Sequence, residues 1–306
     1  MFKFIVRRIA QTIPVVIGVT ILVFSLMHLI PGDPAQIIAG ESAQPEQIEQ
    51  MRERLGLNDP IPVQYGKFLA NIAQGDLGQS IRSNRPVLDE IKYRFWITFE
   101  IAVYSTILSV FLGLIAGIIS AVRKYTVSDI VIMIVALFGL SMPNFWLGIM
   151  LIQFFSMKLG VLPPSGWGTP QQVILPVITL GTAGAAIIAR MTRSSMLEVI
   201  DQDYIRTARA KGVRERVVIY KHALKNALIP IVTVIGLEFG SLLGGTVLTE
   251  TVFAINGMGK LIIEAIQARD FPVVQGTILI AALLFVLVNL IVDISYRLLN
   301  KRVELN

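Results

Sequence analysis

Four polar side chains stand inside otherwise apolar segments, and their types could do chemistry there. Glu238 lies near the middle of one segment, Asn289 and Asp293 lie one helical turn apart in another, and Asn144 follows Pro143 in a third. An ionised carboxylate at the centre of a bilayer costs about 2.5 kcal/mol or more, so Glu238 should face water, protein or a partner charge. All four are candidates for lining a polar path across a bilayer. The alternatives are a hydrogen-bonded carboxylate at Glu238 and a structural patch at Asn289 and Asp293.

The usual residues of enzymes and metal sites are scarce. The chain has no cysteine, and its two histidines, His28 and His222, do not form a metal-ligand spacing. A membrane-embedded enzyme would need a nucleophile, base or metal set at helical spacing in the spans, and none is found. No phosphate loop of the form G-x-x-x-x-G-K-[ST] occurs, and the nearest fragment, residues 257–260, lacks the first glycine. We therefore predict that the chain is not an enzyme and has no catalytic, cofactor or metal site.

The composition indicates that membrane-spanning helices carry the four polar side chains named above. Of 306 residues, 54% are hydrophobic and 16% are charged, which is typical of an all-α polytopic membrane protein. A helix needs about 20 apolar residues to cross the hydrocarbon. Six stretches qualify or nearly do, and we expect the first to be an uncleaved helix rather than a signal peptide. They are residues 9–30, 97–121, 130–155, 173–189, 228–248 and 277–299. The third should bend at Pro143.

The lysines and arginines indicate how these six spans are oriented. Basic residues gather on one side, in residues 3–8, 123–124, 190–225 and 297–302. The short segments opposite carry only Lys158, Lys260 and Arg269. The positive-inside rule then predicts that both termini are cytoplasmic. The net charge of +6 is thus explained by topology, and no affinity for nucleic acid is expected.

The chain is expected to divide into three parts. Residues 1–30 hold the N-terminal segment and first span, residues 31–96 form an extracytoplasmic loop, and residues 97–306 form a core of five spans. In the loop, apolar residues recur at helical spacing from Pro45 to Gly56 and again before Gly75, which predicts two amphipathic helices. The loop is interpreted either as a lid or docking platform or as a stabilising cap.

Small residues repeat along the fifth span. Gly236, Gly240 and Gly244 recur every four residues, and Gly113 and Gly117 repeat the spacing in the second span. Such stripes allow neighbouring helices to approach closely. Tight packing is the expected role, and a sliding surface against a partner subunit is the alternative.

The segment 190–227, between the fourth and fifth spans, is the longest cytoplasmic connection. It predicts a short helix from Tyr204 to Lys211, capped by Asp201 or Asp203 and ended by Gly212. In this helix Ala208 and Gly212 lie one turn apart and could let another protein approach the backbone between the surrounding arginines. A basic loop held by anionic lipid headgroups is the alternative.

Residues 206–212 read R-T-A-R-A-K-G, and residues 222–227 read H-A-L-K-N-A. This pair resembles the cytoplasmic signature of the permease subunits of ABC importers, in its dipeptide/oligopeptide (and nickel) branch. The resemblance extends along nearly the whole chain, through PGDP, GDLG, MPNFW, LPPSG and DFP at residues 31–34, 75–78, 142–146, 162–166 and 270–272.

The resemblance implies a type I ABC importer permease-like fold and a role for the short helix in coupling to an ATPase. The residues implied are Tyr204, Arg206, Thr207, Ala208, Arg209, Lys211 and Gly212. It implies four partner chains, namely a second similar permease, two cytoplasmic ATPase subunits that bind ATP and Mg²⁺, and an extracytoplasmic solute-binding protein. Membrane lipid is the remaining partner, in a bacterial or archaeal cytoplasmic membrane.

Peptide is the cargo that the resemblance favours, with nickel, glutathione or another small solute as alternatives. A proton-coupled secondary transporter is the rival class, because Glu238 and Asp293 could carry protons. Such proteins commonly contain two related halves, and residues 1–150 and 151–306 show no convincing repeat.

Overall fold

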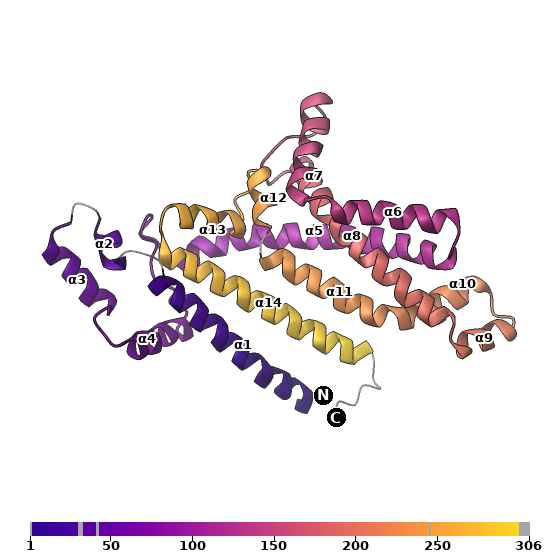
Figure 1. Cartoon of the computed structure of the whole chain (residues 1–306), viewed down its shortest axis with the longest axis horizontal. Coiled ribbons are helices and arrows are strands. Elements are labelled where there is room, and N and C mark those ends of the chain that lie inside the picture. Colours follow the sequence, from indigo (N-terminus) through magenta and orange to yellow (C-terminus); the bar gives the residue numbers. More distant parts are fainter. Residues whose placement is uncertain (1, 30–32, 41–42, 245, 300–306) are drawn as a thin grey trace. The chain divides into compact units, whose positions relative to one another are not determined.

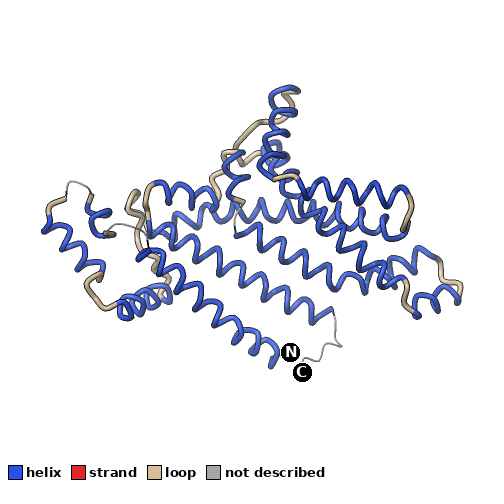
Figure 2. The backbone as a smooth tube through the Cα atoms, viewed as in Figure 1, coloured by secondary structure: helices blue, strands red, loops and turns tan. Residues whose placement is uncertain are grey.

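The computed structural model describes residues 2–29, 33–40, 43–244 and 246–299. Within these ranges every regular element is a helix, and the only strand-like pairing is an isolated bridge between Gln79 and Pro86 (Figures 1 and 2). The residues Pro31, Gly32, Lys301 and Arg302, used in the sequence argument, lie outside the described ranges.

The chain separates into two compact units. Unit 1 comprises Met1–Ile97 and Gly257–Val286, and unit 2 comprises Thr98–Asn256 and Leu287–Asn306. The division expected from the sequence, at residues 30 and 96, concerns position relative to a membrane and stays a prediction.

In the described ranges five helices are long and apolar enough to cross a membrane, and the number of spans rises to six if one bent pair is counted as a single span. The five are α1 (Phe2–Leu29), α5 (Val87–Val122), α8 (Pro170–Ile200), a continuous run that ends in α11 (Leu224–Gly244), and α14 (Phe271–Leu299). The predicted fifth span continued to Leu248, whereas the structure ends α11 at Gly244 and places Leu248 in a separate helix, α12 (Val247–Val252).

The bent pair confirms the predicted break at Pro143. Helix α6 (Val127–Ser141) is followed by α7 (Asn144–Leu151) and η1 (Ile152–Lys158), and the two arms meet at 99°. Pro143 supplies no backbone N–H and disfavours helical geometry at Met142, which is extended (ψ 128°). The third predicted span is therefore broken rather than gently curved.

In unit 1, the loop after α1 contains both predicted amphipathic helices. They are α3 (Pro45–Leu55), ended by Gly56 at φ 67°, and α4 (Ile61–Ala73), followed by Gly75 at φ 78°. A short helix, α2 (Pro34–Ala39), precedes them, and α13 (Met258–Gln267) leads to α14. Helix α4 packs on α1, where the Thr20 and Tyr65 hydroxyls lie 2.8 Å apart.

In unit 2, glycines bring α5 and α8 into close contact. A Cβ placed on Gly113 would lie 2.9 Å from the Ala185 carbonyl oxygen, and one on Gly117 would lie 2.6 Å from that of Ala189. Real Cβ atoms do not approach backbone so closely, so these two positions require glycine. The small-residue spacing predicted for the second span thus serves this helix pair.

Candidate functional site

The predicted cytoplasmic helix is present as α9 (Asp203–Ala210) in unit 2. Gly212 follows at φ 75°, in the left-handed region that favours glycine, as expected for a helix stop. The predicted caps are wrong. Gln202 is the N-cap residue and makes no side-chain cap hydrogen bond, Asp203 already belongs to the first turn, and Asp201 ends α8.

Helix α9 is anchored by one fully buried side chain. Ile205 is 0% exposed and belongs to an apolar cluster that joins the ends of α5, α8 and α11. Ala208 packs against the same cluster. The predicted open gap between Ala208 and Gly212 is therefore wrong at Ala208, because the helix is turned so that this residue faces inward. The exposed residues of the segment are Asp203, Tyr204, Arg206, Thr207, Arg209, Ala210, Lys211 and Gly212.

Two polar contacts join α9 to the helical run that follows it. The Asn226 side-chain amide donates to the Tyr204 hydroxyl at 2.7 Å, and the Arg209 guanidinium makes two hydrogen bonds to Glu215, at 2.8 and 3.1 Å. The hydrogen bonds to Glu215 raise the pKa of Arg209 above its ordinary value. Tyr204 and Arg209 are thus bonded to the helical run after α9. Arg206 is 72% exposed and makes only an exposed ion pair, at 3.6 Å, with Asp203 of its own helix.

A buried ion pair that the sequence analysis missed lies at the same end of unit 2. Asp129, 3% exposed, accepts two hydrogen bonds from Arg193 at 2.7 Å, one from the Tyr125 backbone N–H at 2.9 Å and one from the Ser120 hydroxyl. This Asp129 clamp joins α5, the turn after it, α6 and α8. Arg193 was counted only as a charge that sets topology, and nothing local to either residue indicates a partner 64 positions away.

Glu238 lies half-buried on α11 and is directed toward α8. Its Oε2 would lie 3.9 Å from a Cβ built on Gly184. Among the described residues no hydrogen bond or ion pair holds this carboxylate, in contrast to Asp129.

The other candidate path residues lie on separate helices of unit 2. Asn144 opens α7 directly after the break, and Asn289 and Asp293 lie half-buried one turn apart on α14. No hydrogen bond in the described part of the chain joins Glu238 to Asn144 or Asn289. The structure places all of these residues in unit 2 without assembling them into one polar cluster.

The glycines of the α11 stripe differ in how closely other residues of the chain approach them. A Cβ on Gly236 would collide with Val292 of α14, and Gly240 is buried. Gly244 has nothing within 4 Å of a built Cβ. The close approach within this chain therefore occurs at the Gly236 end of the stripe.

A second buried carboxylate was also missed. Glu250 of α12 is 0% exposed and accepts hydrogen bonds from the hydroxyls of Thr98 at 2.8 Å and Thr246 at 3.0 Å. The available signal was an acid directly after the fifth apolar stretch, in the segment V-L-T-E-T-V-F at residues 247–253.

These features define a polytopic helical membrane protein in which an exposed basic helix, α9, is anchored to the ends of α5, α8 and α11. A family model described as binding-protein-dependent transport system inner membrane component matches residues 113–305, and a model of the N-terminal part of such components matches residues 1–102. The chain belongs to this family of transport-system membrane components.

Named relatives match along the full length. The dipeptide transport system permease protein DppB of Alkalihalophilus pseudofirmus is 47% identical, with 99% of this chain and 100% of that protein covered. The glutathione transport system permease protein GsiC of Pectobacterium atrosepticum is also 47% identical, with 99% of each chain covered.

A solved structure of the MetNI methionine ABC transporter, in an inward-facing conformation, contains a chain of similar fold. The TM-score is 0.59 at 19% identity, covering 69% of this chain and 96% of that chain. The predicted fold is confirmed: the chain is a type I ABC importer permease-like, multi-pass protein of the bacterial cytoplasmic membrane. The cytoplasmic position of both termini stays a prediction from the positive-inside rule.

Proposed function

We propose that this chain forms part of the translocation path of an ATP-driven importer of short peptides, and that α9 is the contact for a separate ATPase. The observation that carries the proposal is the construction of α9. Arg206 is exposed on α9, and Lys211 and Gly212 are exposed directly after it, while Ile205 is fully buried where three long helices meet. A force applied to the outer face would reach α5, α8 and α11 through close-packed side chains, which transmit displacement because they have little free volume.

The Asp129 clamp supports the same role. Arg193 lies on α8 shortly before α9, and its two hydrogen bonds to Asp129 hold α8 to α6. Movement of α9 would therefore displace several spans together rather than bend one helix end. Rigid-body rocking of this kind is an established mode of switching between access states.

We infer that ATP and Mg²⁺ bind to partner chains. In support, the fragment nearest to a phosphate loop, residues 257–260, runs into α13, where Lys260 lies 3.8 Å from Glu264. The assembly that we propose contains a second similar permease, two ATPase subunits and an extracytoplasmic solute-binding protein. Residues 190–227 would face the ATPases, and residues 31–96 would face the binding protein.

Short peptides are the cargo that the relatives favour, because the two named above carry dipeptide and glutathione transport in their names. Nickel or another small solute is the alternative. We assign Glu238 to the path, since it is half-buried and the described residues provide it with no hydrogen-bonding partner. Asn144, Asn289 and Asp293 are further candidates for the path.

The test is uptake of a labelled dipeptide by vesicles that hold the complete assembly, with ATP hydrolysis measured in parallel. We expect uptake to require ATP and to persist when a protonophore removes the proton gradient. Uptake that stops with the gradient while ATP remains would instead indicate a proton-coupled transporter.

The role of α9 is tested by Arg206→Glu, with Arg123→Glu as the control. Both arginines are exposed in unit 2, but Arg123 lies in the turn after α5 and outside α9. We expect Arg206→Glu to lower uptake at least tenfold, through loss of ATPase binding or of coupling, while Arg123→Glu stays near the unmodified level. Equal activity of both variants would remove α9 from the mechanism.

A further inference from the structure

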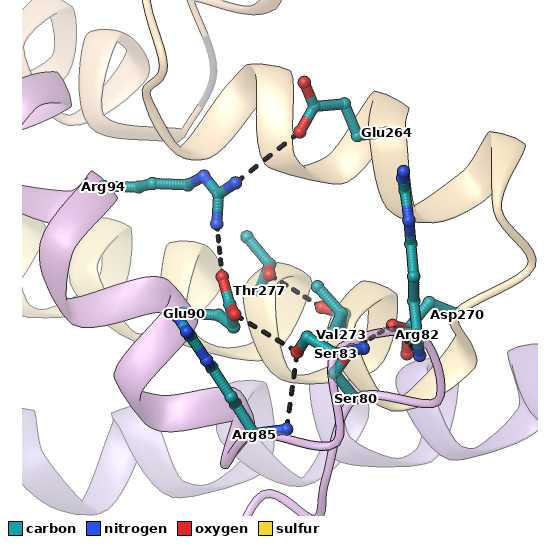
Figure 3. Close-up of polar contacts among 10 residues, drawn as sticks. All are labelled: Ser80, Arg82, Ser83, Arg85, Glu90, Arg94, Glu264, Asp270, Val273 and Thr277. Carbon is teal, nitrogen blue, oxygen red and sulfur yellow. Dashed lines mark hydrogen bonds and ion pairs between the residues drawn. The ribbon is translucent and has the colours of Figure 1, made fainter.

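The loop between α4 and α5 in unit 1 is held in shape by Asp270. Figure 3 shows the Asp270 carboxylate beside Ser80 and Arg82. This carboxylate, in a residue that is 3% exposed, accepts hydrogen bonds from the Ser80 hydroxyl at 2.5 Å and from the backbone N–H groups of Ile81 and Arg82 at 3.1 and 3.4 Å. Asn84 turns the chain at φ 54°. The loop is therefore fixed, and it presents the Arg82 side chain from a defined backbone position.

Beside this loop lies a polar recess with a volume of about 440 Å³. Ligand pockets typically measure roughly 300–1,000 Å³, so the recess can hold a small molecule. Its walls come from unit 1, namely from the loop, the start of α5, α13 with the turn that follows it, and the start of α14. The polar side chains with charge are Arg82, Glu90, Arg94, Glu264 and Asp270. The positive-inside rule predicts a cytoplasmic N-terminus, so residues 31–96, which follow the first span, are expected on the extracytoplasmic side together with the recess.

The charges on the two sides of the recess differ. Arg94 lies between two acids, with nitrogen–oxygen distances of 2.7 Å to Glu90 and 3.6 Å to Glu264. Arg82 lies on the opposite side in Figure 3 and is exposed, and no carboxylate among the described residues is within ion-pair distance of its side chain. One wall thus offers a guanidinium available to an anion. The other offers the Glu90 and Glu264 carboxylates, which both contact Arg94, and Glu264 also lies 3.8 Å from Lys260.

Such a distribution favours a ligand that carries both signs of charge. A carboxylate would gain a bidentate partner at Arg82. An ammonium group would gain the Glu264 carboxylate, which is 41% exposed and therefore accessible. In an extended dipeptide the two termini are separated by about 7 Å, since each residue spans about 3.3–3.6 Å. This length suits a recess of the observed volume.

We propose that this recess is a receiving site for a short peptide with free termini, with the peptide carboxylate at Arg82 and its ammonium group at Glu264. The inference rests on the proposed function, because it takes the cargo to be peptide. It adds a binding site on the permease itself, where a peptide released on the extracytoplasmic side would be held before entering the path.

The experiment measures binding of labelled dialanine to the purified permease–ATPase complex, without ATP and without the solute-binding protein. The variants are Arg82→Gln and Glu264→Gln, and the control is Arg85→Gln, an exposed arginine on the same loop that does not line the recess. We expect each of the first two variants to weaken binding at least tenfold and Arg85→Gln to bind normally.

Blocked peptides assign the two ends. C-terminally amidated dialanine should bind weakly to the unmodified complex and should lose little more affinity on Arg82→Gln. N-acetylated dialanine should behave in the same way toward Glu264→Gln. If all variants bind dialanine equally, or if blocking either terminus changes nothing, the assignment is wrong.

Uptake by the complete assembly separates this inference from the proposed function. If the unmodified assembly imports dialanine while the complex alone fails to bind it, the importer role stands and the receiving site does not. Loss of binding-protein association in Arg82→Gln without any measurable binding of free dialanine would also overturn the site, and would indicate that the recess docks the binding protein. Failure of uptake in the unmodified assembly would count against peptide as the cargo.

Discussion

Each compact unit contains a buried aspartate, and the two aspartates accept hydrogen bonds from similar donors. Asp129 in unit 2 and Asp270 in unit 1 are each 3% exposed, and each accepts a hydrogen bond from one serine hydroxyl. Asp129 also accepts from one backbone N–H of a turn, and Asp270 accepts from two. They differ in charge compensation. Asp129 also binds the Arg193 guanidinium at two positions, whereas Asp270 accepts only from neutral donors in the described part of the chain.

The difference shows that a buried, hydrogen-bonded aspartate can have two roles, depending on whether an arginine pairs with it. A guanidinium neutralises Asp129 and fastens three long helices, so this end of unit 2 is closed and suited to transmit movement. Asp270 holds a loop through neutral donors and does not pair with the neighbouring Arg82 guanidinium. The recess in unit 1 is therefore lined by an arginine that is available to an anion. Where the arginine pairs with the aspartate, as at Asp129, the helices are held together. Where the neighbouring arginine stays exposed, as beside Asp270, its charge remains available to a ligand.

The largest effect is expected when the guanidinium is removed from the Asp129 clamp. Arg193→Met keeps the length of the side chain but leaves a buried carboxylate without its cation, which should lower the free energy of unfolding by about 3 kcal/mol. Chemical denaturation of the purified complex in detergent measures this loss. The double variant Asp129→Asn with Arg193→Met should be more stable than Arg193→Met alone, because a neutral amide needs no cation. Simple additivity would show that charge pairing is not the cause.

A smaller loss of unfolding free energy is expected when Asp270, which pairs with no cation among the described residues, is replaced. Asp270→Asn turns one acceptor into a donor that faces either the Ile81 N–H or the Ser80 hydroxyl, so about 1–2 kcal/mol should be lost, mostly locally. Hydrogen exchange at the Ile81 and Arg82 amides should speed up, while exchange in α14 stays slow. A global loss equal to that of Arg193→Met would abolish the contrast between the two aspartates.

Helix positions in both units could be predicted from the sequence because their signals are local. Apolar length placed the spans, Gly56 and Gly212 marked helix ends, and Pro143 marked the break. The orientation of α9 could not be predicted, since it depends on Ile205 entering a cluster formed by distant helices. Ala208 therefore faced inward against expectation.

The two aspartate networks were beyond sequence reasoning for a related reason. The Asp129–Arg193 and Ser80–Asp270 contacts join residues 64 and 190 positions apart, and no periodicity encodes such pairs. In a single sequence, charged residues near span ends are explained equally well by topology. The candidate path residues were found because an acid within an apolar run is conspicuous in itself.

The two serines provide a milder comparison. The Ser80 hydroxyl donates to Asp270 and accepts from the Ser83 backbone N–H at 3.0 Å, whereas the Ser120 hydroxyl donates to an aspartate that keeps three other hydrogen bonds. Ser80→Ala should therefore cost about 1 kcal/mol, and Ser120→Ala should cost less. Denaturation midpoints of the two variants, measured side by side, check the order. A larger loss for Ser120→Ala would mean that the Asp129 clamp depends on its serine hydroxyl more than the Asp270 network depends on Ser80.

The smallest effect concerns a second link at the cytoplasmic end of unit 2. Lys124 and Asp201 lie 3.4 Å apart, but their side chains are 42% and 63% exposed, and such pairs contribute little because water screens them. Lys124→Gln should change the free energy of unfolding by less than about 0.5 kcal/mol, and high salt should leave the unmodified protein nearly as stable. If Lys124→Gln destabilised the complex as strongly as Arg193→Met, the turn after α5 would be held by its surface pair. The buried Asp129 clamp would then lose its place as the element that joins these helices.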